Sequence, residues 1–217
     1  IKALLLPHLR DFEFSFKKRG AMLAESAELL GSYLREVFVL NEKNANFRIF
    51  SPDELASNKL DAVLNATGRA YMWPHSSDDS TLSSRGRVME MLSEHTLQSW
   101  FQGYVLTGRH GIFPSYEAFL PIIDSMIRQY LKFLELSGRY AWRKPIPSLN
   151  YLVTSVCWRQ DHNGFSHQNP GFISALLTKA KEEHIVTAYI PADANMLLAV
   201  VEEVLHSTNR VNLIVSD

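Results

Sequence analysis

The densest group of side chains that could carry chemistry lies in residues 158–168, which read WRQDHNGFSHQ. Its members that can ionise or hydrogen-bond are Arg159, Gln160, Asp161, His162, Asn163, Ser166 and His167. An apolar, β-branched run precedes the group, a helical pattern follows it, and Gly164 offers a turn, so we expect a strand-to-helix loop. Ligands of α/β sheets bind beyond the strand ends, which makes this loop a candidate site. A surface loop that is merely rich in hydrogen-bonding residues remains the alternative interpretation.

Glu94 is the second candidate, because it lies where an expected strand passes into an expected helix. An acid in a first helical turn commonly does no more than stabilise the helix dipole, by a few tenths of a kcal/mol. A carboxyl that binds a ligand through a shared proton must keep that proton at neutral pH. Its ordinary pKa is about 4.3, so the pKa must rise by roughly three units, worth about 4 kcal/mol, and only a closed site supplies that.

Composition places these residues in an ordinary globular protein. The 217 residues are 46% hydrophobic and 21% charged, which is enough to build a sizeable core. A net charge of −1 argues against a nucleic-acid partner, and no apolar run is long enough for a membrane span. The single cysteine, Cys157, excludes an internal disulfide and fits a reducing environment, so we expect a cytoplasmic protein.

The elements that must position the candidates alternate along the chain. Strands are expected at 47–50, 87–92, 112–113, 149–154, 185–190 and 211–215. Helices are expected at about 94–106, 117–136, 172–181 and 193–207, with Ser115 as a cap of the second. This alternation predicts an α/β fold with a mainly parallel sheet and helices on both faces.

The ends of the chain have the character of internal segments. The sequence opens on IKALLL without an initiator Met and closes on a strand-like VNLIV run. We therefore expect a piece of a longer protein, with a helical lead-in at 1–44 and an α/β domain at 45–217.

Six segments, in order and spacing, closely resemble phosphoketolases. They are RVMEMLSEH (87–95), LTGRHG (106–111), SYEAF (115–119), WRKP (142–145), WRQDHNGFSHQ (158–168) and PADAN (191–195). The resemblance is to the middle domain of that family, which binds the pyrimidine half of thiamine diphosphate. The wider transketolase-like superfamily shares the glutamate and a Gly-x-Ser/Thr-His-Gln segment, here 164–168.

The resemblance implies cleavage of xylulose 5-phosphate or fructose 6-phosphate by inorganic phosphate to acetyl phosphate and an aldose phosphate. Glu94 would share its proton with the cofactor pyrimidine, and His162 and His167 would move protons during the reaction. Phe119 could stack on the pyrimidine, although a core position is the commoner fate of such a residue. The expected contacts to substrate or phosphate are Ser57, Lys59, Tyr116, Arg139, Gln160 and Asn163.

The resemblance also implies partners. In this family the cofactor diphosphate and its Mg²⁺ are held by an N-terminal domain, usually of the other subunit of a homodimer. No Gly-Asp-Gly metal motif occurs in the 217 residues, so we expect no metal ligands here.

The chain departs from the family pattern at several positions, which puts substrate preference and full activity in question. Lys59 stands where an arginine is usual and loses the bidentate fork. Val156 and Cys157 replace a His-Val pair, Asn169 replaces an aspartate, and Pro114 replaces a serine.

Two other functions remain open on the sequence. One is a non-catalytic homologue that keeps the dimer surface and binds sugar phosphate. The other is a metal hydrolase built on Asp161, His162 and His167, although no second ligand motif accompanies them.

Overall fold

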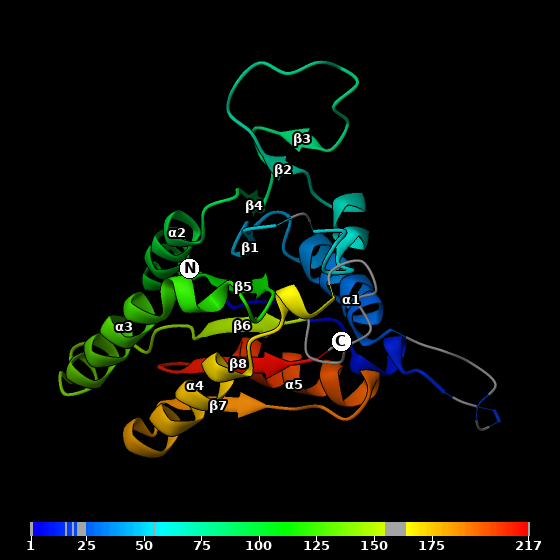
Figure 1. The fold of residues 1–217 in the computed structure, drawn as a ribbon. Coiled ribbons are helices and arrows are strands. Elements are labelled where there is room, and N and C mark those ends of the chain that lie inside the picture. Colours follow the sequence, from blue (N-terminus) through cyan, green and yellow to red (C-terminus); the bar gives the residue numbers. More distant parts are fainter. Residues whose placement is uncertain are drawn as a thin grey trace.

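The computed structural model describes residues 2–15, 17–18, 20, 25–53, 55–154 and 164–216, and these build one eight-stranded sheet (Figure 1). The strand order is β3-β2-β4-β1-β5-β6-β8-β7, and every pair of neighbouring strands is parallel. The strands are β1 (Phe47–Ser51), β2 (Arg69–Ala70), β3 (Leu82–Ser83), β4 (Val88–Glu90), β5 (His110–Ser115), β6 (Leu149–Val153), β7 (Val186–Tyr189) and β8 (Val211–Val215). The predicted α/β fold with a mainly parallel sheet is confirmed.

Helices cover both faces of the sheet (Figure 1). They are α1 (Ser26–Leu40), α2 (Glu94–Leu106), α3 (Asp124–Ser137), α4 (Pro170–Glu183) and α5 (Ala194–His206), with short 3-10 turns η1 (Leu9–Phe12), η2 (Asp61–Asn65), η3 (Leu120–Ile123) and η4 (Gly164–His167). Helices α2, α3 and α4 pack on one face, whereas α1 and α5 pack on the other.

Neighbouring residues of the central strands pack into opposite layers of the core. Phe113 packs with α2 and α3, while Ile112 beside it packs with α1 and α5. Leu213 and Ile214 divide in the same way on β8. Because both faces are covered, β6 and β8 are buried along their whole length, and their two asparagines bond to each other, with Asn212 donating to Asn150 at 2.8 Å.

The helix expected at 117–136 begins later than predicted. Ser115 is the last residue of β5 and does not cap a helix, and the chain then turns through η3 before α3 starts at Asp124. Pro121 lacks an N–H and lies in the first turn of η3, where a donor is least needed. The residues after β5 are therefore free to form a connection at the sheet edge.

Helix α1 belongs to the same core as the sheet. Leu30 and Leu34 are fully buried in the cluster that contains Ile49 of β1. The side chain of Asn41, at the end of α1, accepts an N–H from Leu5 and donates to its carbonyl, at 3.0 and 2.7 Å. The described part of the expected lead-in at 1–44 is thus bound to the α/β unit by packing and by hydrogen bonds.

Arg87 joins the start of β4 to the carboxyl end of α1. Its guanidinium is almost fully buried, donates to the carbonyl oxygens of Phe38 and Asn41 at 2.9 and 3.3 Å, and lies 4.8 Å from the ring centre of Phe38. The last carbonyls of a helix have no partner within the helix. Arg87 satisfies that of Phe38 and adds a second donor to that of Asn41, which also accepts the N–H of Ala45 at 2.9 Å.

We expect Arg87→Met to destabilise the fold by about 2 kcal/mol, because it removes the arginine donor to the Phe38 carbonyl oxygen and one donor to that of Asn41. For a chain of this size the melting temperature should fall by about 4–8 °C in thermal unfolding followed by circular dichroism. Arg85→Met is the matched control, because Arg85 is exposed. An equal effect of both substitutions would contradict the bridging role of Arg87.

None of the helices in the described part of the chain is long and apolar enough to cross a membrane.

Candidate functional site at the carboxyl edge of the sheet

Because the strands are parallel, the connections that follow β1, β4, β5 and β6 all leave the sheet at the carboxyl ends of its strands. This side of the sheet is called the carboxyl edge below. The turn at 57–59 follows β1, Glu94 follows β4, and Tyr116 follows β5 directly. His167 reaches the same edge from the connection between β6 and α4. The carboxyl edge therefore gathers predicted site residues that are widely separated in sequence.

His167 is held against the residues after β5. Its ring makes T-shaped contacts with Tyr116 and Phe119, with centres 5.0 and 5.2 Å apart and planes at 88° and 83°. Its carbonyl oxygen accepts the N–H of Ala118 at 3.2 Å, and its Nδ1 lies 2.8 Å from the hydroxyl of Ser166. These contacts place the imidazole beside the aromatic ring predicted to stack on a cofactor.

Tyr116 is fully buried, and its hydroxyl holds the turn that follows β1. The phenol Oη donates to the carbonyl oxygen of Ser57 at 2.9 Å. Asn58, in the same turn, is fully buried and accepts the Thr154 hydroxyl at 2.8 Å. Tyr116 was predicted to contact substrate, and in this structure its hydroxyl orders the predicted phosphate-binding turn.

Lys59 completes that turn in a left-handed conformation with φ 60°. Its ammonium lies 3.4 Å from the carboxylate of Glu25, and both side chains are about half exposed. Gly31 of α1 allows the close approach, since a Cβ there would lie 3.0 Å from the Lys59 carbonyl oxygen. The turn is thus fixed by α1 on one side and by Tyr116 on the other.

Glu94 is the first residue of α2 and is half-buried. Among the described residues its carboxylate has no hydrogen-bonding or ionic partner. Helix α2, which Glu94 begins, packs against η3, and η3 begins one residue after Phe119. Leu92 beside it is 88% exposed, so the described residues do not by themselves enclose the carboxylate.

Glu117 is a residue of this edge that the sequence analysis did not select. Its side chain is only 3% exposed, and its Oε2 accepts the backbone N–H of Asn169 at 2.7 Å. Burial raises the pKa of this carboxyl above its ordinary value of 4.5, and the hydrogen bond from Asn169 acts in the opposite direction. The signal in the sequence was an acid within an otherwise apolar run after a strand.

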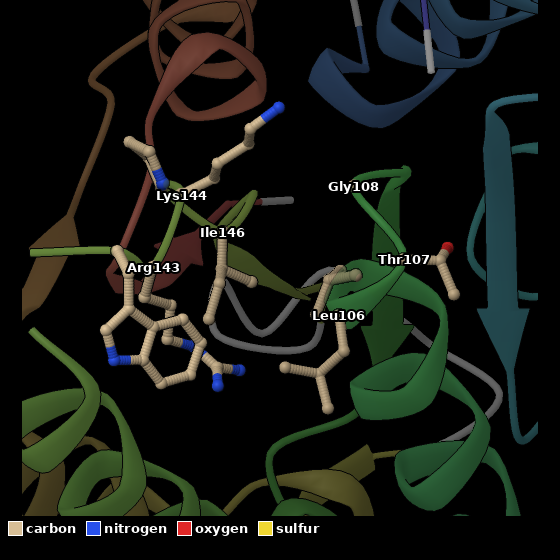
Figure 2. A pocket seen from close by; sticks show the side chains of 9 residues that line it. Leu106, Thr107, Gly108, Arg143, Lys144 and Ile146 are labelled. Atoms are coloured by element: carbon tan, nitrogen blue, oxygen red, sulfur yellow. The ribbon is translucent and has the colours of Figure 1, made fainter. Parts of the chain in front are cut away.

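Arg139 is not brought to the carboxyl edge. It follows the carboxyl end of α3 and forms an exposed ion pair with Glu135 at 2.8 Å. The chain continues from there to a hollow of about 420 Å³ at the amino ends of β5 and β6 (Figure 2). The side chains around this hollow include Leu106, Trp142, Arg143 and Ile146. It lies at the opposite edge of the sheet from His167 and Glu94.

The predicted site residues Gln160, His162 and Asn163 lie outside the described residues, as does Asp161. Their places in the site therefore stay predictions. In the ranges that the structure does describe, no three His, Cys, Asp or Glu side chains gather as a metal site would need.

Transketolases share this fold. The structure superimposes on transketolase from Campylobacter jejuni with a TM-score of 0.58 and 16% identity, over 98% of this chain and 28% of that one. A transketolase from Pichia stipitis gives a TM-score of 0.61 and 14% identity, over 97% of this chain and 28% of that one. These similarities define the class of fold, a transketolase-like α/β domain.

The sequence comparisons identify the family. Residues 28–207 match the family model described as D-xylulose 5-phosphate/D-fructose 6-phosphate phosphoketolase. The chain is 52% identical over 215 residues to a probable phosphoketolase of Brucella suis, and 50% identical over 216 residues to probable phosphoketolase 1 of Rhizobium meliloti. It belongs to the phosphoketolase family, and it spans 27% of the length of these two relatives.

The raised pKa of Glu117 has a consequence for stability. A carboxyl whose pKa is higher in the folded than in the unfolded chain stabilises the fold fully below the unfolded value. That contribution is lost as the pH rises through the folded value. Glu117→Gln has no group that titrates at this position, so it does not lose this contribution. The melting temperature of Glu117→Gln minus that of wild type should therefore increase from about pH 4 to about pH 7.

Thermal unfolding of both proteins across this pH range measures the difference. Glu28→Gln is the control, because Glu28 is exposed on α1 and its substitution should leave the pH profile parallel to that of wild type. A difference between Glu117→Gln and wild type that is constant with pH would contradict the raised pKa.

Proposed function

We propose that this chain is part of a thiamine diphosphate-dependent phosphoketolase. The whole enzyme would cleave xylulose 5-phosphate, fructose 6-phosphate or both with inorganic phosphate to acetyl phosphate and an aldose phosphate. The observation that supports this most is the carboxylate of Glu94, which has no partner among the described residues and lies at the start of α2 inside the segment that matches the family model.

The residues present fit the pyrimidine half of the cofactor on which phosphoketolases and transketolases depend. An aminopyrimidine offers ring nitrogens that can share a proton with a carboxyl, and the carboxyl of Glu94 has no partner in the described ranges of the chain. An aromatic face such as that of Phe119 suits a flat heterocycle. When bound, thiamine diphosphate supplies the carbanion and the electron sink for cleavage of the carbon–carbon bond.

The chain's own groups would bind, orient and move protons. Glu94 would hold a proton at its carboxyl once a bound pyrimidine and a surrounding protein surface exclude water. His167, held between Tyr116 and Phe119, would give or take a proton at its imidazole. His162 is proposed for the same task.

Phosphate groups would be bound by the turn after β1 and by the loop before α4. Lys59 supplies a cation next to Ser57, and an incoming phosphate would compete with its exposed ion pair to Glu25. Gln160 and Asn163 are proposed as uncharged donors to the same phosphate groups. The cofactor diphosphate and Mg²⁺ are assigned to regions outside these 217 residues, in a cytoplasmic homodimer.

The first test is Glu94→Gln in the full-length enzyme, because it keeps the size of the side chain and removes the shared carboxyl proton. We expect turnover, followed as acetyl phosphate release, to fall about a hundredfold or more while the melting temperature stays within a few degrees. Glu28→Gln should keep wild-type turnover. Near wild-type turnover in Glu94→Gln would show that Glu94 only stabilises the dipole of α2 and does not take part in the reaction.

The second test separates proton transfer from structure at His167. His167→Ala should lower turnover by a factor of about a hundred, while the melting temperature falls by only a few degrees. His206→Ala is the control, because His206 is exposed at the end of α5. A second control is His184→Asn, since His184 has φ 54° and asparagine tolerates that conformation. If His167→Ala only melts earlier and retains full turnover, His167 is structural.

A further inference from the structure

We propose that Glu117 is a positioning residue that fixes His167 in the site by holding Asn169, the N-cap residue of α4. This inference rests on the proposed function of His167. The starting observation is a carboxyl with 3% exposure at the functional edge of the sheet, one residue after Tyr116.

Two hydrogen bonds tie the segment after β5 to the segment before α4. The N–H of Ala118 donates to the carbonyl oxygen of His167, and the N–H of Asn169 donates to Oε2 of Glu117. The first bond fixes the backbone of His167 itself, at 3.2 Å. The second, at 2.7 Å, fixes the chain two residues further on. His167 is thus the first residue of a three-residue segment, His167 to Asn169, that is hydrogen-bonded at both ends to the segment after β5.

Asn169 is the N-cap residue of α4. Its side-chain Oδ1 accepts the N–H of Gly171 at 3.1 Å, and Pro170 occupies the first turn. The backbone N–H of this capping residue is directed to Glu117, and a carboxylate is favoured by the dipole at a helix N-terminus. Since Phe172 and Leu176 bury α4 in the core, Glu117 links His167 to a packed helix.

A buried carboxyl is costly for folding, and the raised pKa of Glu117 reflects that cost. The hydrogen bond from Asn169 offsets part of it. The carboxyl provides a hydrogen-bond acceptor for the backbone N–H of Asn169, which lies two residues after His167. A residue that acts on a catalytic group in this way should affect the rate more than substrate binding, because the turn held by Tyr116 and Ser57 does not depend on it.

The test compares two substitutions of Glu117 in the full-length enzyme. Glu117→Gln keeps an oxygen that can accept the N–H of Asn169, whereas Glu117→Met has a similar size and no such acceptor. We expect Glu117→Met to lower kcat by a factor of about 10–100, because small misplacement of a reacting group is costly, with KM for phosphate within about twofold. Glu117→Gln should recover kcat to within about threefold of wild type.

The second readout does not depend on turnover. In protein with ¹³C-labelled histidine we expect the rings of Tyr116 and Phe119 to shift the signal of the His167 ring carbons, and loss of that signal in His167→Asn would assign it. We expect this signal to move toward the position of an exposed histidine in Glu117→Met and to stay in place in Glu117→Gln. Glu203→Ala, an exposed acid bonded to Tyr189, should change neither readout.

The outcomes separate this inference from the proposed function. An unmoved His167 signal in Glu117→Met, or equal impairment by Gln and Met, overturns the positioning role. A wild-type enzyme without phosphoketolase activity overturns the proposed function, and the histidine spectrum then still decides whether Glu117 positions His167. Should Glu117→Met fail to fold, Glu117→Asp withdraws the acceptor by one methylene and must also move the signal. A stationary signal there overturns the inference.

Discussion

The parallel direction of the strands is the constraint on which the rest of this structure depends. Parallel neighbours must be joined by crossovers, so helices cover both faces and the strands between them are buried. Because both faces of the central strands are covered, they cannot line a binding site. The candidate site is therefore built from the connections at the carboxyl edge, which bring together residues as far apart in sequence as Ser57 and His167.

Polar contacts at this edge fix the connections to one another. Tyr116 binds the turn after β1, Thr154 binds Asn58 in the same turn, and Glu117 binds Asn169. Each of these bonds is buried or partly buried, where loss of one partner costs more than the bond itself contributes. The edge is therefore a rigid frame, and the carboxylate of Glu94 stands at it without a partner among the described residues.

The described residues supply a frame and do not supply the enclosure that the proposed chemistry requires. Glu94 is half-buried and Leu92 beside it is almost fully exposed. The proposed function assigns the missing burial to the bound pyrimidine and to protein surface outside this chain. This agrees with the fact that the chain spans 27% of the length of its phosphoketolase relatives.

The sequence alone determined the class of fold, because apolar strands alternating with amphipathic helices leave few arrangements other than a parallel sheet. It also determined the family through contiguous motifs, which include Glu94 and His167. Only the tertiary structure decided which distant residues meet. The contact of Glu117 with Asn169 spans 52 positions and that of Tyr116 with Ser57 spans 59. Periodicity reports the local face of an element, whereas such pairs are set by how elements pack, which also directs Arg139 away from the carboxyl edge.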